Sequence, residues 1–222
     1  MENWMKAPTE AFRNYRRAFW TDISTTKKRE RALFYQRWFD HGVLRLFWTN
    51  MHQLTPEFWR SNHPTPSRFD KLAAQGIRTI ISLRGSTTAP WALLEQEACT
   101  RLDITLETVA LQSRAAPQKQ ELLRLIQLFK SVQKPVLVHC KSGADRAGLA
   151  SAIYLMVVKG EPLEKARKML SMRYLHMSRS KAGVLDCLLD EFAHSHHSDF
   201  ETWISEDYDA TKVQRKFARA NG

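Results

Sequence analysis

A cysteine and an arginine in the segment HCKSGADRAG, residues 139–148, have the types and spacing that covalent phosphate chemistry needs. The apolar run KPVLV leads into His139 and Cys140, and the run LASAIYLMVV follows the segment, so we expect a buried strand, a loop and then a helix. Arg146 stands near the start of that helix. Because a helix N-terminus offers free backbone N–H groups and the positive end of the helix dipole, the loop is predicted to bind an anion.

The small side chains of the segment allow its backbone to close around a group the size of phosphate, with the N–H groups of residues 141–148 pointing inward. Arg146 adds a planar cation that can bind two phosphate oxygens. Cysteines in such a positive field ionise readily, so we interpret Cys140 as a nucleophile that forms a phosphocysteine. The predicted phosphate-binding residues of the loop are Lys141, Ser142, Gly143, Ala144, Ala147 and Gly148.

Other interpretations of the segment fit less well. A nucleotide-binding loop of the G-x-x-x-x-G-K-[ST] type needs a lysine where Leu149 stands, and the dinucleotide pattern G-x-G-x-x-G is absent. A metal bound by His139 and Cys140 would need further ligands at readable spacing, and none is found. The remaining alternative is that Cys140 is a small buried residue. We expect neither a cofactor nor a metal.

The elements around the loop alternate between strands and helices. Strands are predicted at residues 41–48, 77–83, 104–111 and 135–139, and helices at 66–76, 90–102, 118–132, 149–157, 163–170 and 184–192. Residues 56–66 hold three prolines and are predicted to form a turn-rich loop. The pattern predicts an α/β fold with a central, mostly parallel sheet flanked by helices, and ligands bind at the carboxyl ends of such strands.

The two ends of the chain differ from this central part. Residues 1–38 contain nine Lys or Arg against four Asp or Glu, with aromatic side chains between them. Two interpretations stay open: a helix lying on an anionic membrane, or a helix packed on the domain with its charges in water. Residues 198–222 are polar and mixed, which predicts a surface helix with a frayed end. We therefore expect an N-terminal extension over 1–40, a main domain over 41–195 and a C-terminal helical tail over 196–222.

The bulk composition limits the class of protein. The 222 residues are 43% hydrophobic, enough for one packed domain, and carry a net charge of +11, which favours polyanionic partners. No zinc-finger spacing, basic zipper or RNP-like strand indicates nucleic-acid binding. Three scattered cysteines imply no disulfide framework, and no secretory signal or apolar run of membrane-spanning length is seen. We expect a cytoplasmic protein, with peripheral membrane contact through residues 1–38 as an open alternative.

At this point the sequence resembles a known family. The pattern His139-Cys140, five residues, then Arg146 is similar to the His-Cys-x5-Arg signature of cysteine-dependent phosphatases, and the surroundings resemble their compact dual-specificity branch. The segments RSNHPTP (60–66), GIRTIISLRG (76–85) and KPVLVHCKSGADRAGLA (134–150) follow in the expected order, and the resemblance covers about residues 41–175. It implies metal-independent hydrolysis of phosphate esters, with Cys140 as nucleophile and Arg146 binding the phosphate.

Two positions depart from that family. The loop that usually supplies the general acid corresponds to LQSRAAP, residues 111–117, which contains no carboxylate. Asp145, directly before Arg146, resembles the loop aspartate of myotubularin-like phosphoinositide phosphatases, the proposed acid there. Asp145 is therefore a candidate acid, and later base; the alternative is that it orients Arg146 or caps the helix. Ala147 replaces the usual hydroxyl residue, so the second step should be slow unless Ser142 or water assists.

The substrate stays open at this stage. Phosphotyrosine-type protein substrates are the first expectation from the resemblance. Lys141 and Arg114 would favour substrates with several negative groups, so a phospholipid or inositol phosphate is the alternative. Arg84 could join these cations or pair with a core carboxylate. A third alternative is a phosphate-binding module with little turnover, because the acid loop and the hydroxyl after Arg146 are both missing.

Overall fold

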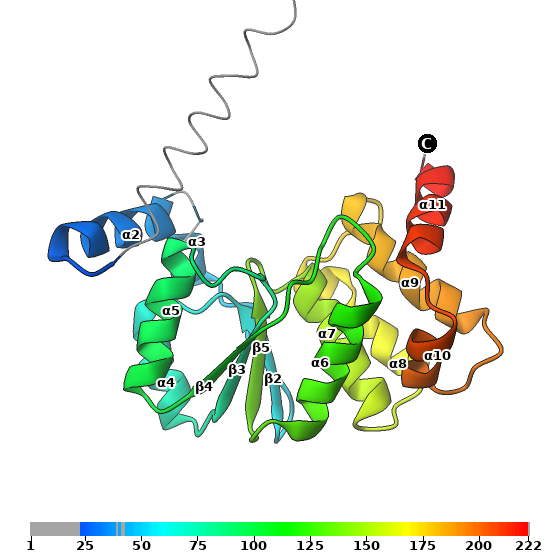
Figure 1. The fold of residues 1–222 in the computed structure, drawn as a ribbon, viewed down its shortest axis with the longest axis horizontal. Helices are drawn as coiled ribbons and strands as arrows, with labels where there is room; N and C mark the ends of the chain where they lie inside the picture. Colours follow the sequence, from blue (N-terminus) through cyan, green and yellow to red (C-terminus); the bar gives the residue numbers. More distant parts are fainter. Residues whose placement is uncertain (1–22, 39, 41–42, 222) are drawn as a thin grey trace, which may run out of the picture.

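The computed structural model describes residues 23–38, 40 and 43–221 of this chain. Its centre is one five-stranded sheet in the order β1-β2-β5-β3-β4 (Figure 1). The strands are β1 His52–Thr55, β2 Phe58–Asn62, β3 Thr79–Ser82, β4 Thr105–Thr108 and β5 Val136–Cys140. β1 pairs antiparallel with β2, and all other neighbours are parallel. The prediction of a mostly parallel central sheet is therefore confirmed.

Helices cover both faces of this sheet. The α-helices are α2 Thr26–Trp38, α3 Leu44–Phe47, α4 Pro66–Ala74, α5 Pro90–Arg101, α6 Lys119–Ser131, α7 Asp145–Val157, α8 Leu163–Ala166, α9 Val184–Ala193, α10 Phe200–Glu206 and α11 Ala210–Asn221. Three single 3₁₀ turns are Arg167–Met169, Met172–Tyr174 and Lys181–Gly183. In Figure 1, α4 and α5 lie on one side of the sheet and α6 and α7 on the other. The core is accordingly divided into two apolar clusters, one on each face.

The register of the strands places the cysteine at the sheet's carboxyl edge. β3 and β5 are buried along their whole length, as parallel strands between two helical layers must be. Cys140, the last residue of β5, pairs with Asn62 on one side, and His139 pairs with Ser82 on the other. The chain therefore leaves β5 between two strand ends and turns directly into α7.

Two expectations for the segment before α4 were wrong. Residues 44–47 form the short helix α3 in place of a strand, while residues 41 and 42 lie outside the described part of the chain. The predicted loop over 56–66 contains β2, which is hydrogen-bonded to both β1 and β5. From the sequence we expect buried strands to be apolar runs, and β2 contains the polar residues Arg60, Ser61 and Asn62. All three are nevertheless buried.

The C-terminal segment also differs from its prediction. Phe200, Trp203 and Ile204 are buried in the main apolar cluster, and α10 packs on α6 and α7 while α11 packs on α9. The spacing of these three residues gives α10 one apolar side, which the polar composition of the segment concealed. The expectation of a surface helix is therefore wrong for α10. The division at residue 195 stays a prediction.

At the other end, residues 1–22 lie outside the described residues, and with them most of the aromatic extension. α2 packs against α5, with Arg29 ion-paired to Glu97. The side chains of Leu33 and Trp38 on α2 are exposed. This part of the extension therefore contacts the domain, whereas membrane contact stays a prediction. No helix of the described part combines the length and the apolar character needed to cross a bilayer.

Candidate active site

Cys140 lies at the base of a tight loop, residues 140–146, which we call the cysteine loop. Its side chain is buried, and the backbone N–H of Gly143 donates a hydrogen bond to its sulfur across 3.2 Å. Ala144 is the N-cap of α7, and Asp145 is the first residue of that helix. The chain thus turns back on the sulfur within three residues and begins a helix beside it, as the sequence predicts.

Gly143 is required by this turn. Its φ is +77°, in the left-handed region that glycine enters without strain. A Cβ atom at this position would lie 2.7 Å from the backbone nitrogen of Asn62 and 2.8 Å from the carbonyl carbon of Ser61. Because both contacts are with the backbone of β2, no side-chain movement could relieve them. Glycine therefore lets the cysteine loop rest directly on β2.

Arg60 holds the loop from behind, which the sequence did not indicate. This side chain of β2 is fully buried and donates to the carbonyl oxygens of Gly143 (2.6 Å), Ala144 (3.1 Å) and Met169 (2.9 Å). Its guanidinium also lies 3.9 Å from the ring centre of Tyr174. Burial lowers the pKa of Arg60 to about 10, so the side chain remains a cation at neutral pH. A buried positive charge therefore lies directly behind the cysteine loop.

Asn50 is a second brace that sequence reasoning missed. It is buried, with a φ of +43°, and its side-chain amide donates to the carbonyl oxygens of Ser142 (3.2 Å) and Tyr174 (3.0 Å). From the sequence we assigned no role to Asn50 or to Arg60, although Arg60 begins the segment RSNHPTP. Both residues contact the loop from positions more than 80 residues away in the chain.

Together these two side chains orient the amides of the loop. Arg60 and Asn50 bind the carbonyl oxygens of residues 142–144. In a planar trans peptide the C=O and the following N–H point in opposite directions. The N–H groups of residues 143–145 are therefore directed away from Arg60 and Asn50, and the bond from Gly143 to Cys140 shows that at least one of them faces the sulfur. Such a ring of amides is suited to an anion.

Arg146 is half-buried and lies in the first turn of α7. Its Nη1 donates to the carbonyl oxygen of Leu83, just beyond the end of β3, across 3.1 Å. Its Nε has no hydrogen-bond partner among the described residues. The guanidinium is thus anchored at one nitrogen and has donors left for a ligand.

Asp145 contacts a residue outside the loop. Its Oδ1 lies 2.8 Å from Nδ1 of His176, and Nε2 of His176 lies 2.7 Å from Oδ2 of Asp186. Burial alone would lower the pKa of His176, but the two carboxylates outweigh it and raise that pKa to about 9. Ala144 has the N-cap position, so the expectation that Asp145 caps α7 is wrong. Among the described residues, no hydrogen bond or ion pair joins the side chains of Asp145 and Arg146.

Lys141 and Arg84 share a buried carboxylate beside the loop. Arg84 binds both oxygens of Asp40 at 2.8 and 2.9 Å, Arg45 lies 2.8 Å from one of them, and Nζ of Lys141 lies 3.4 Å from the other. Burial alone would raise the pKa of Asp40, but these arginines hold it below its ordinary value. Of the two alternatives for Arg84, pairing with a core carboxylate is the one found. Lys141 stays at the loop with its charge partly offset.

A surface hollow of about 600 Å³ borders the cysteine loop, and neither Cys140 nor Arg146 is among the described residues that line it. Its walls include Ser142, Ala144 and Asp145 from the cysteine loop, together with Arg114, Trp48, Leu175, Met177 and Lys181. Arg114 is therefore brought to the loop from the segment that replaces the usual acid loop. Leu175 and Met177 are more than half exposed, which gives the hollow an apolar rim beside its cations.

Ala147 and Gly148, which were expected to bind phosphate, lie within α7 and outside the cysteine loop. The N–H of Gly148 donates to the carbonyl oxygen of Ala144 inside α7, so the expectation that it binds phosphate is wrong. A Cβ on Gly148 would lie 2.8 Å from Met169 O, which explains the need for glycine by packing. Ala147 is fully buried and offers no hydroxyl. Oγ of Ser142, by contrast, lies inside the loop and accepts a bond from Ala144 N at 3.4 Å.

The fold and this loop are those of the compact dual-specificity and tyrosine phosphatase class. The sequence profile of a family described as "DSP-PTPase phosphatase fused to NAD+ Kinase" matches residues 49–183. The chain belongs to this family. The match includes the cysteine loop, β1 to β5 and the residues that brace the loop.

Curated relatives agree with this class. The chain is 26% identical over 154 residues to the dual specificity protein phosphatase TpbA of one Pseudomonas aeruginosa strain, covering 68% of this chain and 64% of TpbA. It is 28% identical over 113 residues to TpbA of a second strain, covering 50% of this chain and 48% of that protein. The matched region thus spans between about half and just under two thirds of the relatives' length.

Solved structures share the fold. A crystal structure of P. aeruginosa TpbA superposes with a TM-score of 0.54 at 17% identity, over 77% of this chain and 91% of that one. A cysteine-to-serine variant of TpbA in complex with phosphotyrosine gives 0.53 at 17% identity, over 79% and 97%. The active form of Tk-PTP gives 0.52 at 18% identity, over 64% and 97%.

Proposed function

We propose that this chain hydrolyses phosphate monoesters through a phosphocysteine formed on Cys140. The observation that carries the proposal is the hydrogen bond from Gly143 N–H to the Cys140 sulfur, because it places a backbone amide of the loop beside the candidate nucleophile. The buried charge of Arg60 and the dipole of α7 add positive potential at the same point. Both favour a phosphate group bound next to Cys140.

The reaction would proceed in two displacements. Cys140 Sγ attacks phosphorus, the S–P bond forms, and the ester P–O bond breaks as the leaving oxygen takes a proton. Water then attacks phosphorus, the S–P bond breaks, and inorganic phosphate leaves the regenerated thiolate. In both steps the amides of the loop and Arg146 would hold the non-bridging oxygens, where negative charge accumulates.

We propose Asp145 as the proton carrier in these steps. It lies in the wall of the hollow, and no carboxylate is present in residues 111–117. The pKa of His176 is about 9, so at neutral pH a positively charged ring faces Asp145 and holds its carboxyl group in place. After giving up its proton to the leaving oxygen in the first step, Asp145 would act as a base in the second step and take a proton from water. In the first step, an ester with a good leaving group would need little protonation of its leaving oxygen.

Phosphotyrosine-type protein esters are the substrates we infer first. The curated relatives are named dual specificity protein phosphatases, and a TpbA variant has been crystallised with phosphotyrosine. The apolar rim formed by Trp48, Leu175 and Met177 could hold an aromatic ring beside the phosphate.

A phospholipid or inositol phosphate is the second candidate. The observation that favours it is the placement of Arg114 and Lys181 in the wall of the hollow, with Lys141 in the same loop. A panel of phosphopeptides, phosphoinositides, inositol phosphates and phosphatidylglycerophosphate distinguishes the two. Binding to anionic vesicles with and without residues 1–38 tests whether the extension brings a cytoplasmic enzyme to a membrane.

A phosphate-binding module with little turnover is the alternative to an enzyme. Hydrolysis of a generic aryl phosphate by the native chain and by the Cys140→Ser variant separates the two. We expect clear turnover by the native chain and loss of at least about 10³-fold in the variant, since a serine hydroxyl is a much weaker nucleophile than the cysteine that it replaces. Equal rates in both would overturn the cysteine mechanism. Tight phosphate binding without turnover in the native chain would favour the binding module.

A further inference from the structure

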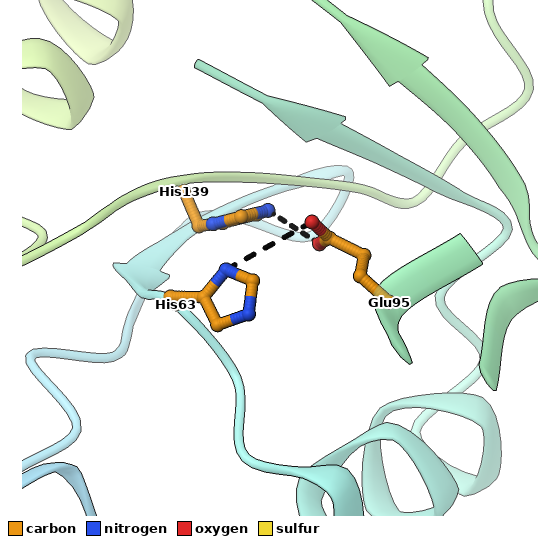
Figure 2. Close-up of side chains that lie close together, drawn as sticks. All are labelled: His63, Glu95 and His139. Atoms are coloured by element: carbon orange, nitrogen blue, oxygen red, sulfur yellow. Dashed lines mark ion pairs between the residues drawn. The ribbon is translucent and has the colours of Figure 1, made fainter. Parts of the chain in front are cut away.

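Three buried residues with metal-binding side chains meet behind the cysteine loop. His139 lies on β5 directly before Cys140, His63 follows the end of β2, and Glu95 lies on α5 (Figure 2). Their exposed fractions are 0, 0 and 1%. Figure 2 shows both rings turned toward the Glu95 carboxylate. One donor atom from each residue lies within 4.8 Å of those of the other two.

Both ring nitrogens of His63 and of His139, and Oε1 of Glu95, lack hydrogen-bond partners among the described residues. Glu95 Oε1 lies only 2.7 Å from His139 Nε2, yet neither atom makes a well-directed hydrogen bond. Among the described residues, twelve buried side-chain nitrogen or oxygen atoms have no partner, and five of these twelve belong to His63, Glu95 and His139. A buried polar atom without a hydrogen-bond partner destabilises the folded chain by about 1–3 kcal/mol. Five such atoms in one cluster indicate that a ligand binds there.

We propose that His63, His139 and Glu95 bind a divalent transition-metal ion of the zinc type in the core behind the cysteine loop. Two imidazoles and one carboxylate form a donor set that zinc accepts, with the fourth position left for water. The separations from Glu95 oxygens to His139 Nε2 and His63 Nδ1 are 2.7 and 3.8 Å. Two ligand atoms that each lie ~2.0–2.1 Å from a tetrahedral zinc ion are ~3.3 Å apart. One of the two observed separations is shorter than this distance and the other is longer.

The charge around the cluster suits this assignment. Burial, and then Arg84, hold the pKa of His63 well below its ordinary value, so the ring is neutral and has a free lone pair. The arginines near His63 also oppose a further cation. Glu95 supplies the negative charge that offsets them, so the site should depend most on Glu95. The ligands are spread over residues 63–139, so no spacing in the sequence could reveal them.

A bound ion would join three elements that position the nucleophile. It would link α5 to the ends of β2 and β5, whose pairing places Asn62 beside Cys140. A ligand that binds only the folded chain stabilises it by RT ln(1 + [L]/Kd). The site is therefore expected to act on the stability of the domain, independently of turnover.

The test is cobalt and zinc binding to the folded full-length chain. Cys140 and the exposed group His196, His197 and Asp207 could also bind these metals, so the starting protein carries Cys140→Ser and His197→Ala. It is treated with chelator and equilibrated overnight with Co²⁺, because the site is buried. We expect one equivalent of Co²⁺ with the visible bands of tetrahedral coordination, displaced by Zn²⁺, and a higher Tm with Zn²⁺.

Added to this background, Glu95→Gln keeps the shape of the side chain and removes its charge, and should abolish the bands. Glu97→Gln, on the exposed side of the same helix, is the matched control and should retain them. If Glu95→Gln fails to fold, X-ray absorption of the zinc-loaded starting protein replaces it, with two imidazoles and one carboxylate expected. Absence of binding by the starting protein, equal binding by Glu95→Gln, or a different ligand set would each overturn the site. None of these readouts depends on phosphatase activity.

Discussion

Asp145, the first residue of α7, is hydrogen-bonded through Oδ1 to Nδ1 of His176, a fully buried ring, across 2.8 Å. The other ring nitrogen contacts Asp186 at 2.7 Å. The aspartate of the cysteine loop is therefore held by a positive charge in the core. This relationship fixes the direction of the loop carboxylate and leads to two predictions, one on stability and one on the pH dependence of the rate.

The first prediction concerns pH and stability. The pKa of His176 is raised to about 9 in the folded chain, against an ordinary value of 6.5. The imidazolium therefore stabilises the folded state fully below about pH 6.5, and this contribution is lost as the pH rises through 9. Denaturant unfolding between pH 6 and 10 should show a falling free energy that is absent in His176→Asn. An NMR titration giving His176 a pKa near 6.5 would contradict this.

The second prediction concerns proton transfer. Asp145→Asn should lower kcat for an alkyl phosphate by about 10²-fold or more and change kcat little for an aryl phosphate with a good leaving group, because only the former needs an acid. The basic limb of the pH–rate profile should disappear with the alkyl ester. Asp186→Asn is the matched control, since it removes the other carboxylate that contacts His176 and leaves Asp145 in place. An unchanged basic limb in Asp145→Asn would remove Asp145 from the acid role.

The third prediction tests the brace behind the loop. Arg60→Lys keeps the charge but cannot reproduce the fork that binds Gly143 O, Ala144 O and Met169 O. Losing one or two buried hydrogen bonds of ~1–3 kcal/mol each should turn the loop amides away from the substrate and lower kcat by about 10-fold or more. Arg101→Lys, at an exposed ion pair with Asp70, is the control. Normal kcat in Arg60→Lys would show that the brace is dispensable.

The fourth prediction compares two glycines. Gly143 and Gly160 both have positive φ, +77° and +64°, so alanine costs roughly 1–2 kcal/mol of backbone strain at either. Only Gly143 also meets backbone atoms, at 2.7 and 2.8 Å, whereas nothing lies within 4 Å of the Gly160 position. Gly143→Ala should therefore lose more stability and about 100-fold in kcat/KM, because the loop shifts from the sulfur. Equal losses in both variants would show that the close approach to β2 does not matter.

Much of the fold follows from local patterns in the sequence. β3 is marked by a run of β-branched residues, β5 by an apolar run and α6 by an amphipathic pattern. All three elements lie where the sequence predicts them. The cysteine loop was predictable for a related reason, because Cys140 to Arg146 are contiguous. β2 was missed because its buried polar residues Arg60 and Asn62 break the apolar pattern of a central strand. Arg60 binds the cysteine loop, and Asn62 binds Trp48 O and Arg68.

The parts of the site that sequence reasoning missed are all non-local. Arg60, Asn50 and His176 reach the cysteine loop from distant elements, and a single sequence carries no pairing information for such contacts. Arg114 was selected because it stood in place of the usual acid loop, and the structure brings it to the same hollow as Asp145. Tertiary contacts of this kind need the folded chain.

The most direct test of the proposed mechanism is a rapid acid quench followed by mass spectrometry of the Cys140 peptide. With an aryl phosphate, we expect a pre-steady-state burst of the alcohol and a matching amount of peptide carrying one phosphoryl group on Cys140. The phosphoenzyme should accumulate because Ala147 offers no hydroxyl to assist its breakdown. In Cys140→Ser both signals should vanish. Steady turnover by the native chain with neither a burst nor a phosphorylated Cys140 would contradict the phosphocysteine mechanism.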